Sequence, residues 1–360
     1  MSEQLSGSEL VALVRRVFQP RPGEKALAIL VDLPDARIPD EPTWAERRAI
    51  AAAWVEELRA HRSELGLDTH LVVYPNVHTN NGDLPERAWL HSGGPLPSAE
   101  ALEPAASISF AELYASHPIL IAITKFSATA PLKLAAKKHP IRAATMPGFR
   151  ADMIPALRLD YTEVNRRVNL LKDLLDRAEG ADFRFDTPAG SCALHVDLRH
   201  RTGHASGGLL PTPGVAGNLP SGEAYIVPYE GELPEDPSRT AGVMPVQFGA
   251  EIVRYRIVAN LALEVISEGP KSREEAALLA KEPAYGNLAE LGLHLAFGRS
   301  DHFGGQVGPA QFSGPDAVIH IDRVYVPETQ PDVKVLSVDL TMADGSAVAL
   351  MRDGEYAVGF

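Results

Sequence analysis

The run ALAILVDL at residues 26–33 is the feature that most limits how this chain can fold. It is a nearly continuous apolar segment of strand length, as expected for a strand that a parallel sheet buries on both faces. Apolar segments of similar length follow at 69–75 and 118–126, and stretches with helical spacing lie at 44–61 and 131–139. Because strands and helices alternate in this way, the sequence predicts a three-layer α/β domain with a mostly parallel sheet.

The pattern of apolar, glycine and proline residues changes in the second half of the chain. After an amphipathic helix expected at 160–178, short strand-like segments alternate with glycine and proline turns, interrupted by one further helix near 272–282. This pattern is typical of a β-rich α+β domain. We therefore predict two domains, an α/β domain at 1–180 and a β-rich, metal-binding domain at 181–360.

Charge and cysteine content restrict the partners of the chain. A formal net charge of −13 and a pI near 5.4, without a basic block to neutralise phosphates, argue against nucleic acid or an anionic membrane as a partner. A small molecule or a short peptide fits better.

The single cysteine, Cys192, excludes an intrachain disulfide and is expected to be buried in a protein from a reducing compartment. Since neither a signal peptide nor a run of about 18 apolar residues is visible, we expect a cytoplasmic protein.

Ionisable residues collect between residues 286 and 326, among glycines and apolar side chains. They include Glu290, His294, Asp301, His302, His320 and Asp322. Burying such groups is costly unless they are paired or bind a metal ion. This stretch is therefore the first candidate for a site that carries chemistry.

The segment AVIHIDRVYV at 317–326 gives the strongest local signal in this stretch. Its β-branched run predicts a strand, and the two-residue period of a strand puts His320 and Asp322 on one face. An imidazole beside a carboxylate suits zinc, cobalt, manganese or iron. A surface histidine next to a solvated aspartate is the alternative interpretation.

Two further segments offer carboxylate and imidazole groups. Glu290 and His294 are four residues apart, a separation that shares one face in a helix and also in a strand, and the nearby glycines leave both structures open. Glu223 opens a predicted strand directly after the tight turn PSG. Each of these residues also has an ordinary structural interpretation, as a helix-end carboxylate, a core-edge imidazole and a hairpin carboxylate respectively.

Several separate motifs together resemble the aminopeptidase T family of metallo-aminopeptidases. They are RAATMPGFRADM at 142–153, NLPSGE at 218–223, AELG at 289–292, HLAFG with FGG at 294–305, and IHID at 319–322. The similarity runs from about residue 140 to the C-terminus. The resemblance implies an exopeptidase that holds two metal ions in its second domain and usually forms a homodimer.

The resemblance also implies a role for each candidate residue. The metal ligands would be Glu223, Glu290, His294, His320 and Asp322, holding up to two zinc, cobalt or manganese ions about 3.5–4 Å apart. One ion would activate water and the other would polarise the scissile carbonyl of a small substrate. Glu223 and Glu290 would then count as catalytic residues too.

This chain departs from the family pattern at two points. The family separates its ELG carboxylate from the next histidine by a longer segment than the one between Glu290 and His294. It also places a tyrosine shortly after that histidine, where this chain has Asp301 and His302. His302 is therefore a candidate catalytic donor, a candidate ligand in place of His294, or a loop residue.

Two other functions are compatible with the same residues. The chain has a more distant resemblance to the dihydroxypyridine dioxygenases, which hold one Fe(II) ion with two histidines and one carboxylate. Here His320, Asp322 and either His294 or His302 would form that triad and leave room for dioxygen and a dihydroxylated aromatic ring. The extra carboxylates Glu223 and Glu290 favour the hydrolase. A degenerate binding protein without catalysis is the third possibility.

Overall fold

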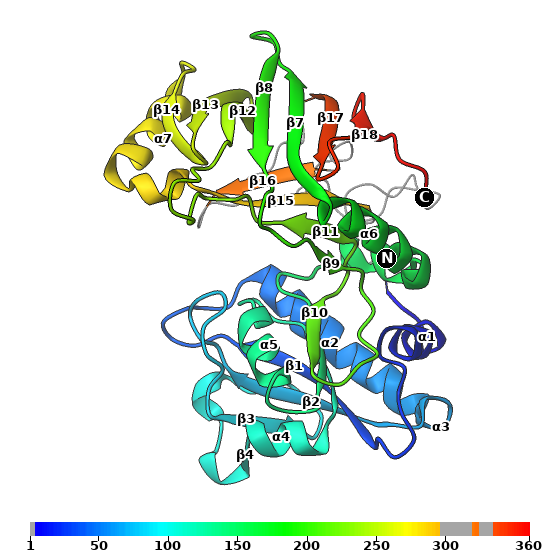
Figure 1. Ribbon diagram of the computed structural model, residues 1–360. Helices are drawn as coiled ribbons and strands as arrows, with labels where there is room; N and C mark the ends of the chain where they lie inside the picture. The colour runs from blue at the N-terminus through cyan, green and yellow to red at the C-terminus, as the bar shows by residue number, and fades with distance from the viewer. Residues whose placement is uncertain (1–3, 296–318, 324–333) are drawn as a thin grey trace. The chain divides into compact units, whose positions relative to one another are not determined.

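Figure 1 shows the computed structural model, which describes residues 4–295, 319–323 and 334–360. Four residues in these ranges are described by their backbone alone, namely Ile319, His320, Asp322 and Lys334. The chain forms two compact units, each with its own sheets.

The chain passes between these units more than once. The first unit consists of Met1–Thr162 together with Gly208–Ser221, and the second consists of Glu163–Gly207 together with Gly222–Phe360. The short returning segment contributes an edge strand, β10 (Val215–Asn218), to the sheet of the first unit. The first unit is therefore built from two stretches that are distant in sequence.

The first unit contains a seven-stranded sheet in the order β10-β6-β5-β1-β2-β3-β4. Its other strands are β1 (Ala26–Leu33), β2 (Asp68–Pro75), β3 (Arg87–His91), β4 (Ser107–Ser109), β5 (Ile119–Ala122) and β6 (Arg142–Thr145). The five strands from β10 to β2 run parallel, and β3 and β4 are antiparallel to their neighbours. The predicted α/β fold with a mostly parallel sheet is thus confirmed.

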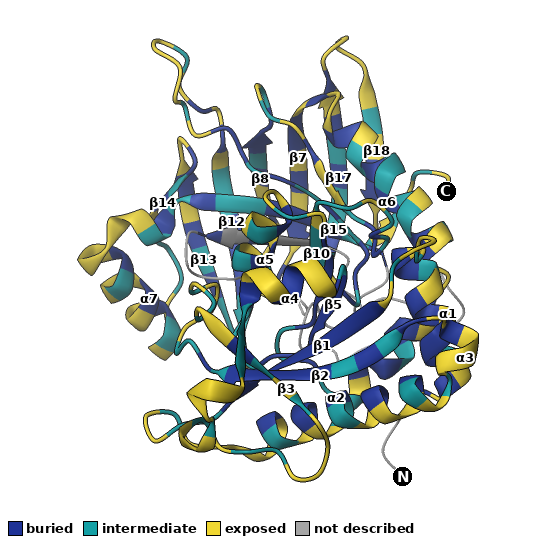
Figure 2. Cartoon of the chain, turned by 90° about the horizontal axis from the view of Figure 1, so that it is seen from below, coloured by how far each residue is buried: buried dark blue, intermediate teal, exposed yellow. Residues whose placement is uncertain are grey.

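Helices cover both faces of this sheet. They are α1 (Gly7–Phe18), α2 (Pro42–Ala60), α3 (Arg62–Leu65), α4 (Phe110–Ser116) and α5 (Thr129–Ala136), with short 3-10 turns at Ala99–Ala101, Pro104–Ala106 and Ala151–Arg158. Helix α2 packs against β1 and β2, whereas Leu113 of α4 and Leu132 of α5 share a core with Leu30 of β1. Figure 2 shows β1 buried along its length, because both faces of the strand are covered.

A pair of histidines lies inside the first unit. His117, at the end of α4, is 5% exposed, and its Nε2 is 2.9 Å from Nδ1 of His70 on β2. Burial, together with the neighbouring His70, lowers the pKa of His117 from 6.5 to about 4. Burial also lowers the pKa of His70, so both imidazoles are neutral at physiological pH.

Acidification should destabilise the protein through His117. Between pH 6.5 and 4 the unfolded chain binds a proton that the folded imidazole does not, so stability declines as the pH falls. At about 1.4 kcal/mol per pKa unit, we expect a loss of up to about 3 kcal/mol across this window. Urea unfolding at pH 7 and pH 4.5 checks this against His117→Gln, which cannot titrate and should lose less stability. Equal losses in both proteins would contradict the prediction.

The second unit contains two antiparallel sheets. The larger has the order β14-β13-β12-β8-β7-β17-β18-β19 and the smaller, which we call sheet C, has the order β16-β15-β11-β9. The larger sheet is made of β7 (Ala178–Asp186), β8 (Cys192–Asp197), β12 (Ala241–Phe248), β13 (Glu251–Val258), β14 (Leu261–Val265), β17 (Lys334–Met342), β18 (Ala347–Arg352) and β19 (Glu355–Tyr356). Sheet C is made of β9 (His204–Ser206), β11 (Glu223–Ile226), β15 (Leu288–His294) and β16 (Ile319–Arg323). This unit is β-rich, as the sequence predicts.

Two helices accompany these sheets. Helix α6 (Tyr161–Leu175) begins at the end of the first unit, and α7 (Pro270–Lys281) is followed by a 3-10 turn at Pro283–Gly286. The apolar stripe of α6, including Val164, Val168 and Leu171, is fully buried, as its spacing predicts. Cys192 is free and buried. No helix within the described ranges is long and apolar enough to cross a bilayer.

A buried ion pair fixes the end of β16. The Arg323 guanidinium donates to Glu275 Oε2 of α7 at 2.8 Å and lies 4.5 Å from the centre of the Tyr255 ring on β13. Tyr255 donates to the same Glu275 oxygen at 3.0 Å, and Lys271 Nζ lies 2.9 Å from the other oxygen. These contacts connect β16 to the helix and to the larger sheet.

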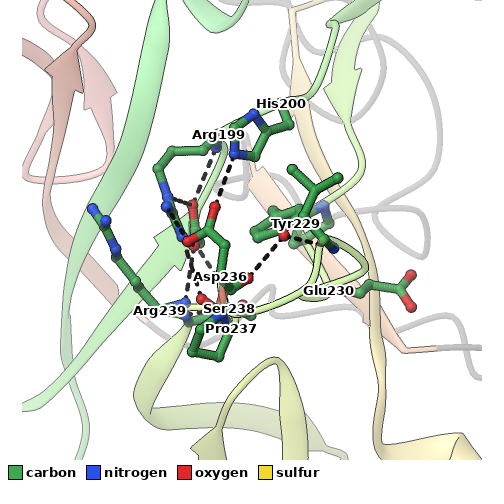
Figure 3. Close-up of polar contacts among 12 residues, drawn as sticks. Arg199, His200, Tyr229, Glu230, Asp236, Pro237, Ser238 and Arg239 are labelled. Carbon is green, nitrogen blue, oxygen red and sulfur yellow. Dashed lines mark hydrogen bonds and ion pairs between the residues drawn. The ribbon is translucent and has the colours of Figure 1, made fainter.

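A second polar network, shown in Figure 3, holds the loop between β11 and β12. Arg199 pairs with Asp197 and with Asp236, at 2.7 Å in each case, and the Tyr229 hydroxyl donates to the Asp236 carbonyl at 2.8 Å. Burial alone would raise the pKa of the Asp197 carboxyl, but hydrogen bonds from Arg199 and from the Arg239 backbone hold it below its ordinary value. Since these groups satisfy one another, we assign the network a structural role.

Candidate functional site

Sheet C brings the candidate ligands together from three distant segments (Figure 1). In its register Glu223 of β11 pairs with His294 of β15, and Glu290 and Gly292 of β15 pair with Asp322 and His320 of β16. Directly paired residues of antiparallel strands lie on the same face, and so do alternate residues of one strand. The backbone positions of all five candidate ligands therefore share one face of the sheet.

The opposite face of sheet C is apolar. Its residues are fully buried, with 0% exposure for Ala224, Ile226, Leu291, Leu293 and Ile321. Glu223, Glu290 and His294, by contrast, are of intermediate burial. The alternation of polar and apolar residues in EAYI and LAELGLH sets this orientation, because a strand that turned over would expose its leucines and bury its carboxylates.

Glu223 and His294 are in contact. The His294 Nε2 lies 3.3 Å from Glu223 Oε1, with side-chain exposures of 14% and 21%. Two ligands that each lie about 2.1 Å from a tetrahedral zinc ion are roughly 3.4 Å apart, so these atoms can share a cation. The same distance also fits an ion pair between the carboxylate and a protonated imidazole.

Backbone contacts hold this pair at the ends of its two strands. The Leu295 amide donates to the Gly222 carbonyl at 2.8 Å, and the Tyr356 hydroxyl donates to the His294 carbonyl at 3.0 Å. Both contacts lie directly beside the Glu223–His294 pair in sequence. They limit the freedom of the two side chains to move apart.

The structure settles the conformation of the segment that carries Glu290. It is a strand rather than a helix, and its register with β16 shifts between Leu288 and Glu290. Such a β-bulge bends the strand locally and changes the direction of the side chains next to it. Glu290 follows the bulge directly and pairs with Asp322.

Two aromatic residues on the same face of sheet C are not among the residues that the sequence predicts for the site. Tyr225 of β11 pairs with Gly292 on one side and with His204 of β9 on the other. The rings of Tyr225 and His204 are stacked, with centroids 5.0 Å apart and an angle of 28° between their planes. Burial, and then the charges of Glu290 and Glu223, raise the pKa of the Tyr225 phenol. The signal in the sequence is the two-residue spacing of Glu223 and Tyr225 in EAYI.

Part of the predicted site lies beyond what the structure describes. Asp301 and His302 fall outside the described residues, and His320 and Asp322 are placed by their backbone alone. Among the described side chains, no group of three or more His, Cys, Asp and Glu residues is close enough to hold a metal ion. The ligand set as a whole therefore stays a prediction, of which the Glu223–His294 contact is the described part.

Comparison with known proteins gives likeness in fold alone. No protein-family profile matches the chain, and no curated protein matches it in sequence. Among the solved structures that match it, two enzymes do so over nearly their whole length. One is 2,5-dihydroxypyridine dioxygenase from Pseudomonas putida KT2440, with a TM-score of 0.58, 15% identity and coverage of 99% of each chain. The other is wild-type AmpT, an aminopeptidase T, from Thermus thermophilus, with a TM-score of 0.52, 15% identity and coverage of 98% of this chain and 99% of that one.

The chain shares its fold with two enzymes of different reaction classes. Both belong to the groups that the motifs resemble, which supports the α/β and β-rich architecture predicted from them. At 15% identity the likeness does not choose between hydrolysis and oxygenation. That choice depends on the residues of sheet C.

Proposed function

We propose that this chain is a metal-dependent hydrolase that cleaves an amide or peptide bond of a small substrate. The observation that carries the proposal is the register of sheet C, which aligns Glu223, Glu290, His294, His320 and Asp322 on one face. Three carboxylates and two imidazoles offer enough oxygen and nitrogen ligands for up to two zinc, cobalt or manganese ions. The carboxylates also offset the charge of two dications.

Each group of this set has a task in amide hydrolysis. Bound dications would supply an activated water and polarise the substrate carbonyl. Glu223 and His294 would bind at the point where β11 meets β15, with His320 and Asp322 of β16 completing the set. Glu290 would take a proton from the attacking water at a carboxylate oxygen and pass it to the leaving amine. His302 remains a candidate donor or ligand from the adjoining segment.

A mononuclear Fe(II) dioxygenase acting on a dihydroxylated aromatic is the second candidate. The similarity to the Pseudomonas putida enzyme over 99% of both chains favours it. His320, Asp322 and either His294 or His302 would be its iron ligands. Glu223 argues for the hydrolase, because a single-iron triad needs one carboxylate and Glu223 lies 3.3 Å from the imidazole that would belong to it.

Metal analysis and paired assays distinguish the two functions. Protein purified without oxygen should contain zinc, cobalt or manganese at up to two ions per chain if it is the hydrolase, and one iron if it is the dioxygenase. After reconstitution, release of amine from aminoacyl-amides is measured beside oxygen uptake with dihydroxypyridines. We expect amide cleavage without oxygen uptake. Oxygen uptake that depends on iron would transfer the assignment to the dioxygenase, and neither activity nor metal would indicate a binding protein.

The proposal includes a setting for this activity. We expect a cytoplasmic homodimer that acts on a small molecule or a short peptide and binds neither nucleic acid nor membrane. Light scattering of the purified protein tests the oligomeric state. A monomer at micromolar concentration would contradict that part of the proposal.

A further inference from the structure

Tyr225 occupies the centre of the ligand face of sheet C. It follows Glu223 by two residues and is paired across the strands with Gly292, which lies between Glu290 and His294 on β15. Because Gly292 has no side chain, the position beside the Tyr225 ring on that strand is not filled by one. The phenol therefore has Glu290 and His294 as diagonal neighbours on β15, Glu223 as its neighbour on β11, and no side chain directly opposite it on β15.

The hydroxyl of Tyr225 has no hydrogen-bond acceptor among the described residues, although its ring is held. The ring stacks on His204, with centroids 5.0 Å apart and the planes 28° from parallel. Other tyrosines of this unit donate to protein groups, Tyr255 to Glu275 and Tyr229 to the Asp236 carbonyl. A partly buried phenol normally finds such a partner. The hydroxyl of Tyr225 is thus positioned to serve a ligand.

We propose that the Tyr225 hydroxyl donates a hydrogen bond to the carbonyl oxygen of the substrate, with the stacked His204 ring as its positioning residue. This inference depends on the hydrolase proposed above. In the reaction, water adds to the carbonyl carbon, the C–N bond breaks, and the amine leaves with a proton from the water. Tyr225 keeps its own proton and stabilises the negative charge that develops on the oxygen.

The surroundings make a neutral donor useful at this position. Glu223 and Glu290 lie on either side, and an oxygen that gains negative charge between them is repelled unless a donor or a cation faces it. A phenol supplies the donor without adding to the negative charge of the face. Removing a donor of this kind from an oxyanion site typically lowers kcat by about 100-fold or more.

Tyr225→Phe in the metal-loaded protein tests this directly, because it removes one oxygen and leaves the ring on His204. We expect kcat for an aminoacyl-amide to fall about 100-fold with KM changed less than about threefold. The affinity for an aminoalkyl phosphonate, which mimics the tetrahedral intermediate, should fall in parallel when measured by calorimetry. Metal content and thermal unfolding should stay unchanged. Tyr285→Phe, the same chemical change outside sheet C, is the matched control.

Two substitutions of His204 test its role as the positioning residue separately from the role of Tyr225 as the donor. His204→Phe preserves a flat ring under Tyr225 and should retain most of the activity, whereas His204→Ala should lower kcat because the phenol loses its stacking partner. If Tyr225→Phe keeps wild-type kcat and phosphonate affinity while the wild-type protein hydrolyses amides, the Tyr225 inference is overturned and the hydrolase stands. If the metal-loaded wild-type protein cleaves no amide, both proposals fall together.

Discussion

Glu223→Gln is expected to lower amide hydrolysis by at least about 1000-fold, or about 4 kcal/mol of transition-state free energy. The glutamine side chain has nearly the same shape but no negative charge, so it neither offsets a dication nor matches the ligand strength of a carboxylate. Because the Glu223 Oε1 lies 3.3 Å from His294 Nε2, the substitution acts at the described part of the ligand set. We expect the metal content to fall from up to two ions per chain to one.

Metal analysis and turnover measured on the same preparation check this result. Glu264→Gln is the control, since Glu264 lies on β14 of the larger sheet and pairs with Arg256 at the surface. It removes the same charge from the chain at an exposed residue outside sheet C. If Glu223→Gln retained full activity with one bound iron, the two-metal hydrolase would be excluded and the dioxygenase favoured.

Glu275→Leu is expected to destabilise the protein by about 3–5 kcal/mol. Glu275 is 3% exposed and Arg323 is 1% exposed, so the substitution takes a buried guanidinium away from its carboxylate. Tyr255 loses an acceptor at the same time. The loss of stability in this variant therefore comes from keeping the charge of Arg323 buried without the Glu275 carboxylate, rather than from the lost attraction between the two groups.

The double variant Glu275→Leu/Arg323→Met provides the control for that interpretation. Apolar side chains of similar size in place of both charges should recover most of the lost stability. Urea unfolding followed by circular dichroism compares the wild-type, single and double variants. A single variant as stable as the wild-type protein would show that Arg323 does not depend on Glu275. Since Arg323 follows Asp322 in β16, we also expect the single variant to bind metal more weakly.

The sequence predicts the first unit well because its signal is local. Strand β1 is apolar at nearly every position since both of its faces are covered, and the helix spacing around Trp54 reports the one face of α2 that is buried. The edge of the sheet is harder to foresee. Strand β3 is short and partly exposed, and β10, with the sequence VAGN, pairs with β6, which is distant along the chain.

The sequence identifies the ionisable residues of the candidate site, but it does not predict how they are arranged in space. The spacing of Glu290 and His294 suits a helix and a strand equally, and only the pairing of β15 with β11 and β16 decides between them. The resemblance to the aminopeptidase T family assigns Glu223 and His294 to the same ligand set. Only the folded sheet shows that the two residues are paired across neighbouring strands. His204 carries no signal in the sequence, and Tyr225 carries only its two-residue spacing from Glu223, because an aromatic residue in a strand is usually a packing residue.

The double passage of the chain between its units matters to anyone who wishes to excise one of them. A polypeptide that stops at Thr162 would lack β10, so β6 would become the border of the parallel sheet and offer its bare amides and carbonyls to other molecules. A soluble fragment of the first unit must therefore carry Gly208–Ser221 on an artificial tether. No single cut releases both halves intact.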